Sequence, residues 1–171
     1  MSECNPRKTR SYQLQWDEWG MPIISSTTMS GLCQGWGFAQ TFLNPNLLLL
    51  AYLRGQGRSA EYVGAHSDFG ASNLTKQPDG VDFLQSDVLV RSLQIPQLAD
   101  EAWSNQDDEV KACITAFATG VNECREEYPE RFDSRLRDVK ITPKAVLGHT
   151  LNILIGFQMM LRLPTIATWM Q

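Results

Sequence analysis

The chain has 171 residues, of which 43% are hydrophobic and 20% are charged, and its formal net charge at pH 7 is −4. This length and apolar content support one domain with its own core and argue against a disordered segment. The acidic balance provides no basic surface for phosphate groups, so no nucleic-acid partner is expected.

The first eight residues include three charged ones, and no apolar segment follows them. A secretory signal peptide needs such an apolar segment, so none is recognised at this end of the sequence. The expected location is the cytoplasm if Met1 is native, or the periplasm if a signal peptide has been removed.

A β-hairpin is predicted over residues 12–25. Apolar and polar residues alternate over 12–16, which indicates a half-buried strand. Residues 17–20 supply a turn, and residues 21–25 can return as a second strand. Pro22 cannot donate a backbone hydrogen bond, so the second strand is expected near an edge or at a strand start.

A first helical region is predicted from the capping residues 26–28 to about Leu53. Gly35 and Gly37 weaken this helix unless a neighbouring backbone packs closely against them. Pro45 is expected to kink or restart the helix, because proline lacks an N–H donor.

Four consecutive leucines over residues 47–50 predict a helix that is buried on all sides. Residues 65–78 are polar and are predicted to form a loop, with a turn at residues 79–80. Further helices are predicted at residues 82–94, before a proline, and at residues 96–103.

The clearest helical pattern covers residues 107–128. Three acidic residues stand at its start, where the helix dipole favours negative charge, and Pro129 ends it. Its apolar positions recur with helical spacing and predict one buried face. These positions are Val110, Cys113, Ile114, Phe117, Ala118, Val121 and Cys124.

The last predicted helix begins with Thr142 as N-cap and Pro143 in the first turn, and runs to about Leu163. Pro164 is expected to stop it. Polar residues interrupt its apolar sequence, so a membrane span is not expected.

The cysteine and histidine content predicts neither a metal site nor a bound cofactor. There is no Cys-x-x-Cys pair, and only His66 and His149 could assist a metal. Cys113 and Cys124 are expected on one helix about 16 Å apart, which is too far for a disulfide. Both are interpreted as small core residues, with a thiol nucleophile as the alternative.

No catalytic centre is predicted within the chain itself. Motifs such as Gly-x-Ser-x-Gly, a phosphate loop or a dinucleotide fingerprint are missing from the sequence. His66 is interpreted as a polar loop residue in preference to a base beside Asp68. His149 is interpreted as a satisfied, partly buried helix residue in preference to a catalytic one.

Three sequence blocks resemble the α-chain of the penicillin and cephalosporin acylase family of N-terminal-nucleophile hydrolases, which includes acyl-homoserine-lactone acylases. Residues 16–24 are similar to its opening signature. Residues 35–40, Gly-Trp-Gly-Phe-Ala-Gln, continue without a gap to residues 58–64, Arg-Ser-Ala-Glu-Tyr-Val-Gly. Two positions depart from the family pattern: Ile23 replaces a usual His, and residues 40–43 lack a frequent Glu-Asp.

The resemblance implies a mainly α fold with a short N-terminal β-hairpin. Such a chain is the α-chain of an αββα N-terminal-nucleophile hydrolase completed by a separate β-chain. Residues 1–171 would form one α-subunit domain. Within it, the hairpin 12–25 would join a shared sheet, residues 27–163 would be helical, and residues 164–171 would lie near the processing site.

The resemblance also implies the chemistry. One precursor cuts itself, and the β-chain, an obligate partner, then begins with the Ser, Cys or Thr that attacks the amide of a small N-acyl compound. Candidate substrates are an acyl-homoserine lactone, a β-lactam side chain, a lipopeptide tail or a related acyl amide. No catalytic residue is expected here, and the reading frame is expected to continue past Gln171 into the β-chain.

In the family, the last α-chain helix helps line the acyl pocket. Ile153, Phe157 and Met160 share one apolar helix face and are the candidate substrate-binding residues. Ordinary core packing is the alternative, and Gln158 and Met159 would take their place if the helix were turned. Two other functions stay open: a non-catalytic helical interaction module, and an autoprocessed family member without acylase activity.

Overall fold

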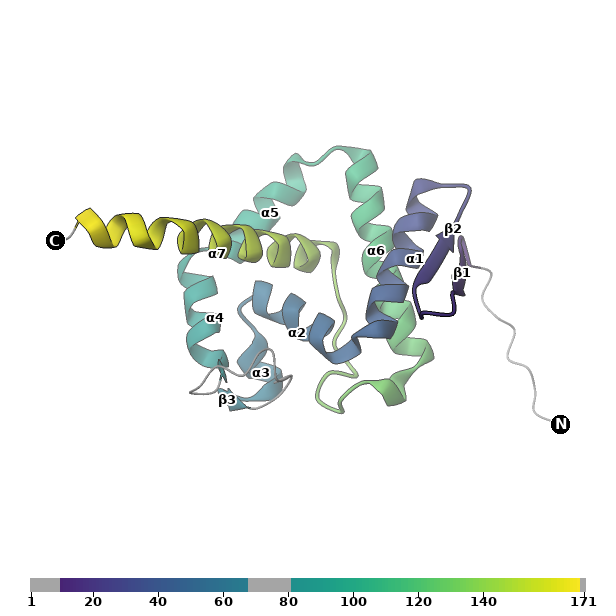
Figure 1. Cartoon of the computed structure of the whole chain (residues 1–171), viewed down its shortest axis with the longest axis horizontal. Coiled ribbons are helices and arrows are strands. Elements are labelled where there is room, and N and C mark those ends of the chain that lie inside the picture. The colour runs from purple at the N-terminus through teal and green to yellow at the C-terminus, as the bar shows by residue number, and fades with distance from the viewer. Residues whose placement is uncertain (1–9, 68–80, 170–171) are drawn as a thin grey trace.

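The computed structural model describes residues 10–67 and 81–169, with side chains described over 10–66 and 82–158. This part of the chain is mainly helical with an N-terminal β-hairpin, as the sequence predicts (Figure 1). Its strands are β1 Gln13–Trp16, β2 Pro22–Ser25, β3 His66–Ser67 and β4 Val81–Asp82. Its α-helices are α1 Met29–Leu43, α2 Pro45–Gly55, α3 Ser59–Val63, α4 Phe83–Ser92, α5 Ile95–Asn105, α6 Asp108–Glu127 and α7 Pro143–Trp169.

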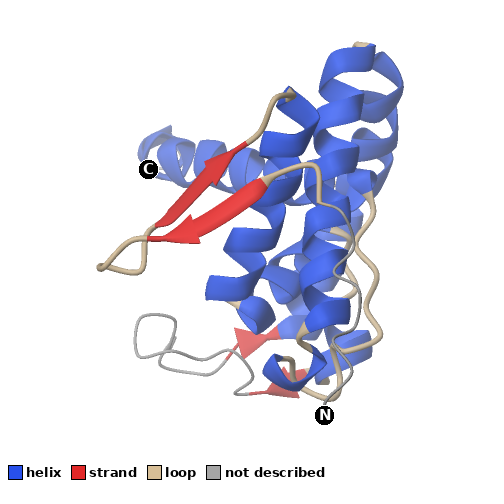
Figure 2. Ribbon diagram, turned by 90° about the vertical axis from the view of Figure 1, so that its right-hand side faces the viewer, coloured by secondary structure: helices blue, strands red, loops and turns tan. Residues whose placement is uncertain are grey.

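The hairpin pairs β1 and β2 in antiparallel register, from Gln13 opposite Ser25 to Trp16 opposite Pro22. Its turn is held by Asp17, whose Oδ1 accepts from the backbone N–H of Met21 at 2.7 Å. Figure 2 shows the hairpin beside the helices, and its strands pack against α1. The predicted hairpin over residues 12–25 is therefore confirmed.

Helices α1 and α6 form the closest pair in the fold. A Cβ added at Gly37 would lie 2.2 Å from the Phe117 carbonyl oxygen, and one added at Gly120 would lie 1.9 Å from that of Gln34. The two backbones therefore touch, as predicted, at Gly37, whereas Gly35 lies against the side chains of Ile24 and Tyr12. The helices run in the same direction, because rings meet from Trp36–Phe117 near their middles to Phe42–Tyr128 near their C-terminal ends (Figure 1).

Pro45 restarts the chain as α2 after α1 ends at Leu43. The prediction of burial on all sides of α2 is wrong. Leu49 and Leu50 are buried in the core, but Leu47 is 50% exposed. Helix α2 packs against α1 and α7. These neighbours leave one side of α2 open, and Leu47 lies on that side.

The middle helices follow their local signals. Asp82 caps α4 by accepting from the backbone N–H of Gln85 at 2.9 Å, and Asp107 caps α6 by accepting from that of Val110 at 2.8 Å. The helices predicted at 82–94, 96–103 and 107–128 are confirmed with shifts of a few residues. Helix α3, the β3–β4 pair and a 3-10 helix were not predicted, because each is only two to five residues long.

The predicted loop at residues 65–78 begins as a strand, since His66 and Ser67 pair with Asp82 and Val81. The rest of that loop and the predicted turn at residues 79–80 lie outside the described residues.

Helix α7 begins as predicted, with Thr142 Oγ1 accepting from the backbone N–H of Ala145 at 3.2 Å. Its first half packs on α2 and α5, where Gly55 lies against the backbone of His149. The helix continues through Pro164 to Trp169, so the prediction that Pro164 stops it is wrong. Proline removes one donor and can bend a helix without ending it. No helix among the described residues is long and apolar enough to cross a membrane.

Candidate functional site

The predicted acyl-pocket residues lie on the second half of α7. Figure 1 shows this half extending beyond the other helices, whereas the first half lies against them. Ile153 and Phe157 are each 55% exposed, and so is their neighbour Leu154. Met160 lies on the same helix, but its side chain is outside the described residues.

These α7 side chains do not belong to the core of this chain. Ile153 and Phe157 are separated by one helical turn and therefore lie on the same face of α7. Large apolar side chains grouped on a surface usually mark contact with a partner or a ligand. Such a face can supply apolar contact and shape, and it carries no group for acid–base chemistry.

Further large apolar side chains are exposed on the hairpin and on α1. Trp19 at the hairpin turn is 82% exposed, and Met21, Ile23 and Trp36 are each more than half exposed. Ile23, which stands where the resembled family usually has His, thus contributes apolar surface on β2. The five tryptophans and six methionines of the chain are partly explained by surfaces of this kind.

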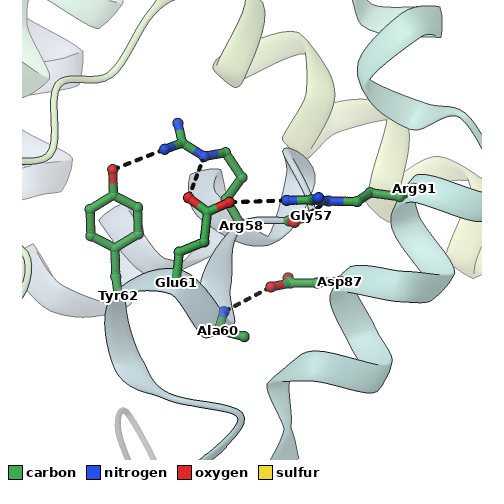
Figure 3. A network of polar contacts seen from close by, with 7 residues as sticks. All are labelled: Gly57, Arg58, Ala60, Glu61, Tyr62, Asp87 and Arg91. Carbon is green, nitrogen blue, oxygen red and sulfur yellow. Dashed lines mark hydrogen bonds and ion pairs between the residues drawn. The ribbon is translucent and has the colours of Figure 1, made fainter.

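The family-like block at residues 58–64 forms a network of charged and polar side chains on α3 and its flanks (Figure 3). Glu61 is its centre: one carboxylate oxygen accepts from Arg58 Nε at 2.8 Å and the other from an Arg91 terminal nitrogen at 3.0 Å. Arg58 also donates to the Tyr62 hydroxyl at 3.3 Å. The network ties the short helix α3 to α4.

Asp87 on α4 fixes the start of α3 from below this network (Figure 3). Its Oδ2 accepts from the backbone N–H of Ala60 at 2.7 Å, and the residue is 5% exposed. Arg91, one turn further along α4, donates from Nε to the Gly57 carbonyl at 2.7 Å. The sequence marked Arg58, Glu61 and Tyr62 but missed both partners, because no local pattern links residues about thirty positions apart.

Replacing Asp87 with alanine is expected to lower the free energy of unfolding by about 1–3 kcal/mol, because it leaves the Ala60 N–H without its acceptor in a buried setting. Asp100→Ala is the matched control. Its carboxylate pairs with Lys144 at 2.8 Å, but both side chains are more than half exposed, so we expect a loss of about 0–1 kcal/mol. Urea unfolding of the two variants measures the difference, and equal losses would contradict the role of Asp87.

His66 lies on β3 with its side chain 78% exposed, and its Nδ1 is 3.6 Å from Asp82 Oδ2. The interpretation of His66 as a loop residue is therefore wrong, because His66 lies on a strand and has a carboxylate neighbour. The proposed alternative partner, Asp68, lies outside the described residues.

His149 is partly buried on α7, with its ring set edge-on to Tyr52 at 5.4 Å. Burial lowers its pKa, which favours the neutral imidazole. Its Nδ1 has no hydrogen-bond partner among the described residues, so the prediction of a satisfied histidine holds only in part. Within the described chain neither His149 nor His66 is hydrogen-bonded to a serine or cysteine.

Cys124, one of the two positions suggested for a thiol nucleophile, does not carry an activated thiol. Burial raises the pKa of the Cys124 thiol to about 12, so it is protonated at neutral pH and packs as a core residue. Over residues 10–67 and 81–169, no cluster of three or more His, Cys, Asp or Glu side chains could hold a metal ion.

Comparison with known proteins identifies the family and the fold of this chain. The model of the penicillin amidase family matches residues 12–162. The fold is similar to that of a thermostable penicillin G acylase from Alcaligenes faecalis, with a TM-score of 0.65 and 18% sequence identity over 85% of this chain and 72% of that chain. The chain therefore belongs to the penicillin amidase family.

Membership has two general consequences. The family is one of hydrolases whose members are heterodimers with a β-subunit. Family and fold together support an acylase-type subunit in general.

Proposed function

We propose that this chain is the α-subunit of a heterodimeric acylase that hydrolyses the amide bond of an N-acyl compound. The observation that carries the proposal is the family match over residues 12–162. The substrate would be an acyl-homoserine lactone, a β-lactam side chain or a related acyl amide. The nucleophile would stand at the N-terminus of the partner β-chain, exposed by autoproteolysis of a common precursor.

The proposed roles of the two chains, with the nucleophile on the β-chain, fit the chemistry of the described residues. An amide hydrolase needs an activated nucleophile and donors that stabilise the oxyanion. A Ser, Cys or Thr at a chain N-terminus supplies the first, with its own α-amino group as base. This chain offers apolar surface instead, on α7 and on the hairpin with α1. Both surfaces are suited to contact with a second chain.

The proposal also assigns a role to each part of the chain. Residues 1–171 act as one α-subunit domain, in which the hairpin 12–25 extends a sheet of the β-chain. Residues 27–163 form its helical part, and residues 164–171 lie near the processing site. The exposed Trp19 and Met21 at the tip of the hairpin fit a site of contact with the β-chain.

The experiment that tests the function uses the complete precursor. We expect it to yield two chains, with Ser, Cys or Thr at the new N-terminus found by Edman sequencing. The processed complex is then incubated with acyl-homoserine lactones, glutaryl amides and aromatic acyl amides, and free amine is followed. Amine should be released from at least one class and lost when the new N-terminal residue is replaced by alanine.

Other outcomes distinguish the alternatives. A processed complex that releases no amine from any of these substrates would identify an autoprocessed protein without acylase activity. A chain that is soluble and monomeric with no partner would identify a helical interaction module.

We propose that Ile153, Phe157 and Met160 form part of the acyl-pocket wall. Phe157→Ala is expected to change the ratio of kcat/KM between short and long acyl groups by about 10-fold. The substitution removes apolar contact with the acyl chain and with no other part of the substrate. Ile153→Ala should act in the same direction with a smaller effect. Leu84 is a similarly exposed apolar residue on α4, so Leu84→Ala is the control and should leave the ratio unchanged. An unchanged ratio in Phe157→Ala would remove this residue from the pocket.

A further inference from the structure

Two cysteines far apart in the sequence face each other across the α1–α6 contact. Cys33 lies four residues before Gly37, and Cys113 lies four residues before Phe117. Residues four apart on a helix share a face, one turn above the other. Because the two helices run in the same direction and touch where Gly37 meets the Phe117 carbonyl, the two cysteines come together one turn from that contact.

The side chains agree with this placement. The Cys33 and Cys113 thiols are within hydrogen-bond reach of each other, and both residues are partly exposed. Burial, together with this contact, raises the pKa of the Cys33 thiol to about 11. Cys124 lies on α6 like Cys113, but it is fully buried.

We propose that Cys33 and Cys113 are a disulfide-forming pair that links α1 to α6 when the protein meets a disulfide oxidant. A disulfide needs Cβ atoms about 3.5–4.5 Å apart. Side chains one turn from a backbone-to-backbone contact meet this requirement more readily than those of helices held apart by larger residues. The partial exposure of both cysteines gives a small oxidant access to the sulfurs.

The reaction is two successive thiol–disulfide exchanges with oxidised glutathione as the oxidant. One cysteine thiolate attacks a glutathione sulfur, and the other glutathione leaves as its thiolate. The second cysteine then attacks the protein sulfur of this mixed disulfide, and the bound glutathione leaves as a second thiolate. Two protein thiols are oxidised to one disulfide, and one oxidised glutathione is reduced to two thiols.

The linkage has consequences for rate and stability. The raised pKa of Cys33 keeps it protonated at neutral pH, so the rate of cross-linking should rise as the pH is increased toward 11. The bridge would close a long loop between residues 33 and 113, which restricts the unfolded chain. The oxidised protein should therefore unfold at a higher temperature than the reduced protein.

The test uses the protein as isolated, complete with any partner chain, treated with oxidised glutathione or with dithiothreitol. We expect oxidation to remove two free thiols and to produce a peptide pair joined between Cys33 and Cys113, found by mass spectrometry without reduction. Thermal unfolding should show an upward shift on oxidation. No hydrolase assay is involved, so failure here is separate from failure of the proposed function.

Variants complete the design. Cys33→Ser and Cys113→Ser should each abolish the cross-link and the thermal shift, whereas Cys124→Ser should keep both. A persistent glutathione adduct on either cysteine, or a bridge to Cys124, would overturn the proposal. If a serine variant fails to fold, the peptide map of the unaltered protein decides the matter by itself.

Discussion

Gly120→Ala is expected to lower the free energy of unfolding by about 1–3 kcal/mol or more, because there is no space for a side chain between α1 and α6. The added Cβ would lie 1.9 Å from the Gln34 carbonyl oxygen and 2.8 Å from the Phe38 nitrogen. Both are backbone atoms and cannot rotate away, so the helices must separate. Urea unfolding of the purified protein measures the loss, and Gly37→Ala should reproduce it from the other helix.

Gly156→Ala is the matched control for this experiment. Gly156 is also a helical glycine, but a Cβ built there has nothing within 4 Å. Alanine is better than glycine in a helix by about 0.5–1 kcal/mol, so this variant should be as stable as the parent or slightly more so. Similar losses for Gly120→Ala and Gly156→Ala would mean that α1 and α6 are not in backbone contact.

Leu49→Ala is expected to lower the free energy of unfolding by about 2–5 kcal/mol, because truncation of a fully buried leucine leaves a cavity in the core. Leu49 is 0% exposed and packs in the cluster that joins α1, α2 and α6. The effect should appear in urea or thermal unfolding as a lower midpoint with little change in slope.

Leu47→Ala is the control on the same helix. This leucine lies two residues away in the same run of four and is half exposed, so its truncation should cost no more than about 0.5 kcal/mol. The sequence alone does not distinguish the four leucines of this run. The difference in unfolding free energy between Leu49→Ala and Leu47→Ala measures how differently the fold buries them. Equal losses at the two positions would contradict the orientation of α2.

Local sequence signals predicted most of the elements in this fold. The alternation at residues 12–16 predicted the hairpin strand, and the capping residues 26–28 and Thr142 predicted helix starts. Each of these signals acts within one turn of chain, through a side chain and a backbone N–H a few residues away. They depend little on the rest of the molecule, which is why they could be recognised without it.

Predictions that depended on contacts with residues far away in the sequence failed more often. The leucine run indicated a buried helix, but α2 has neighbours on only part of its circumference and leaves Leu47 outside. The rule that proline ends a helix failed at Pro164, where α7 continues. The block at residues 58–64 marked Glu61, whereas Asp87 and Arg91 became visible only once α4 was placed beside α3.

The sequence by itself determined the positions of the longer helices apart from the end of α7, the hairpin, and the resemblance that led to the penicillin amidase family. It also marked Ile153 and Phe157 as one apolar face, because helical spacing is a local property. Only the tertiary structure decided that this face is exposed and that Cys33 lies against Cys113. Such contacts join residues many positions apart, and their geometry depends on how the helices pack.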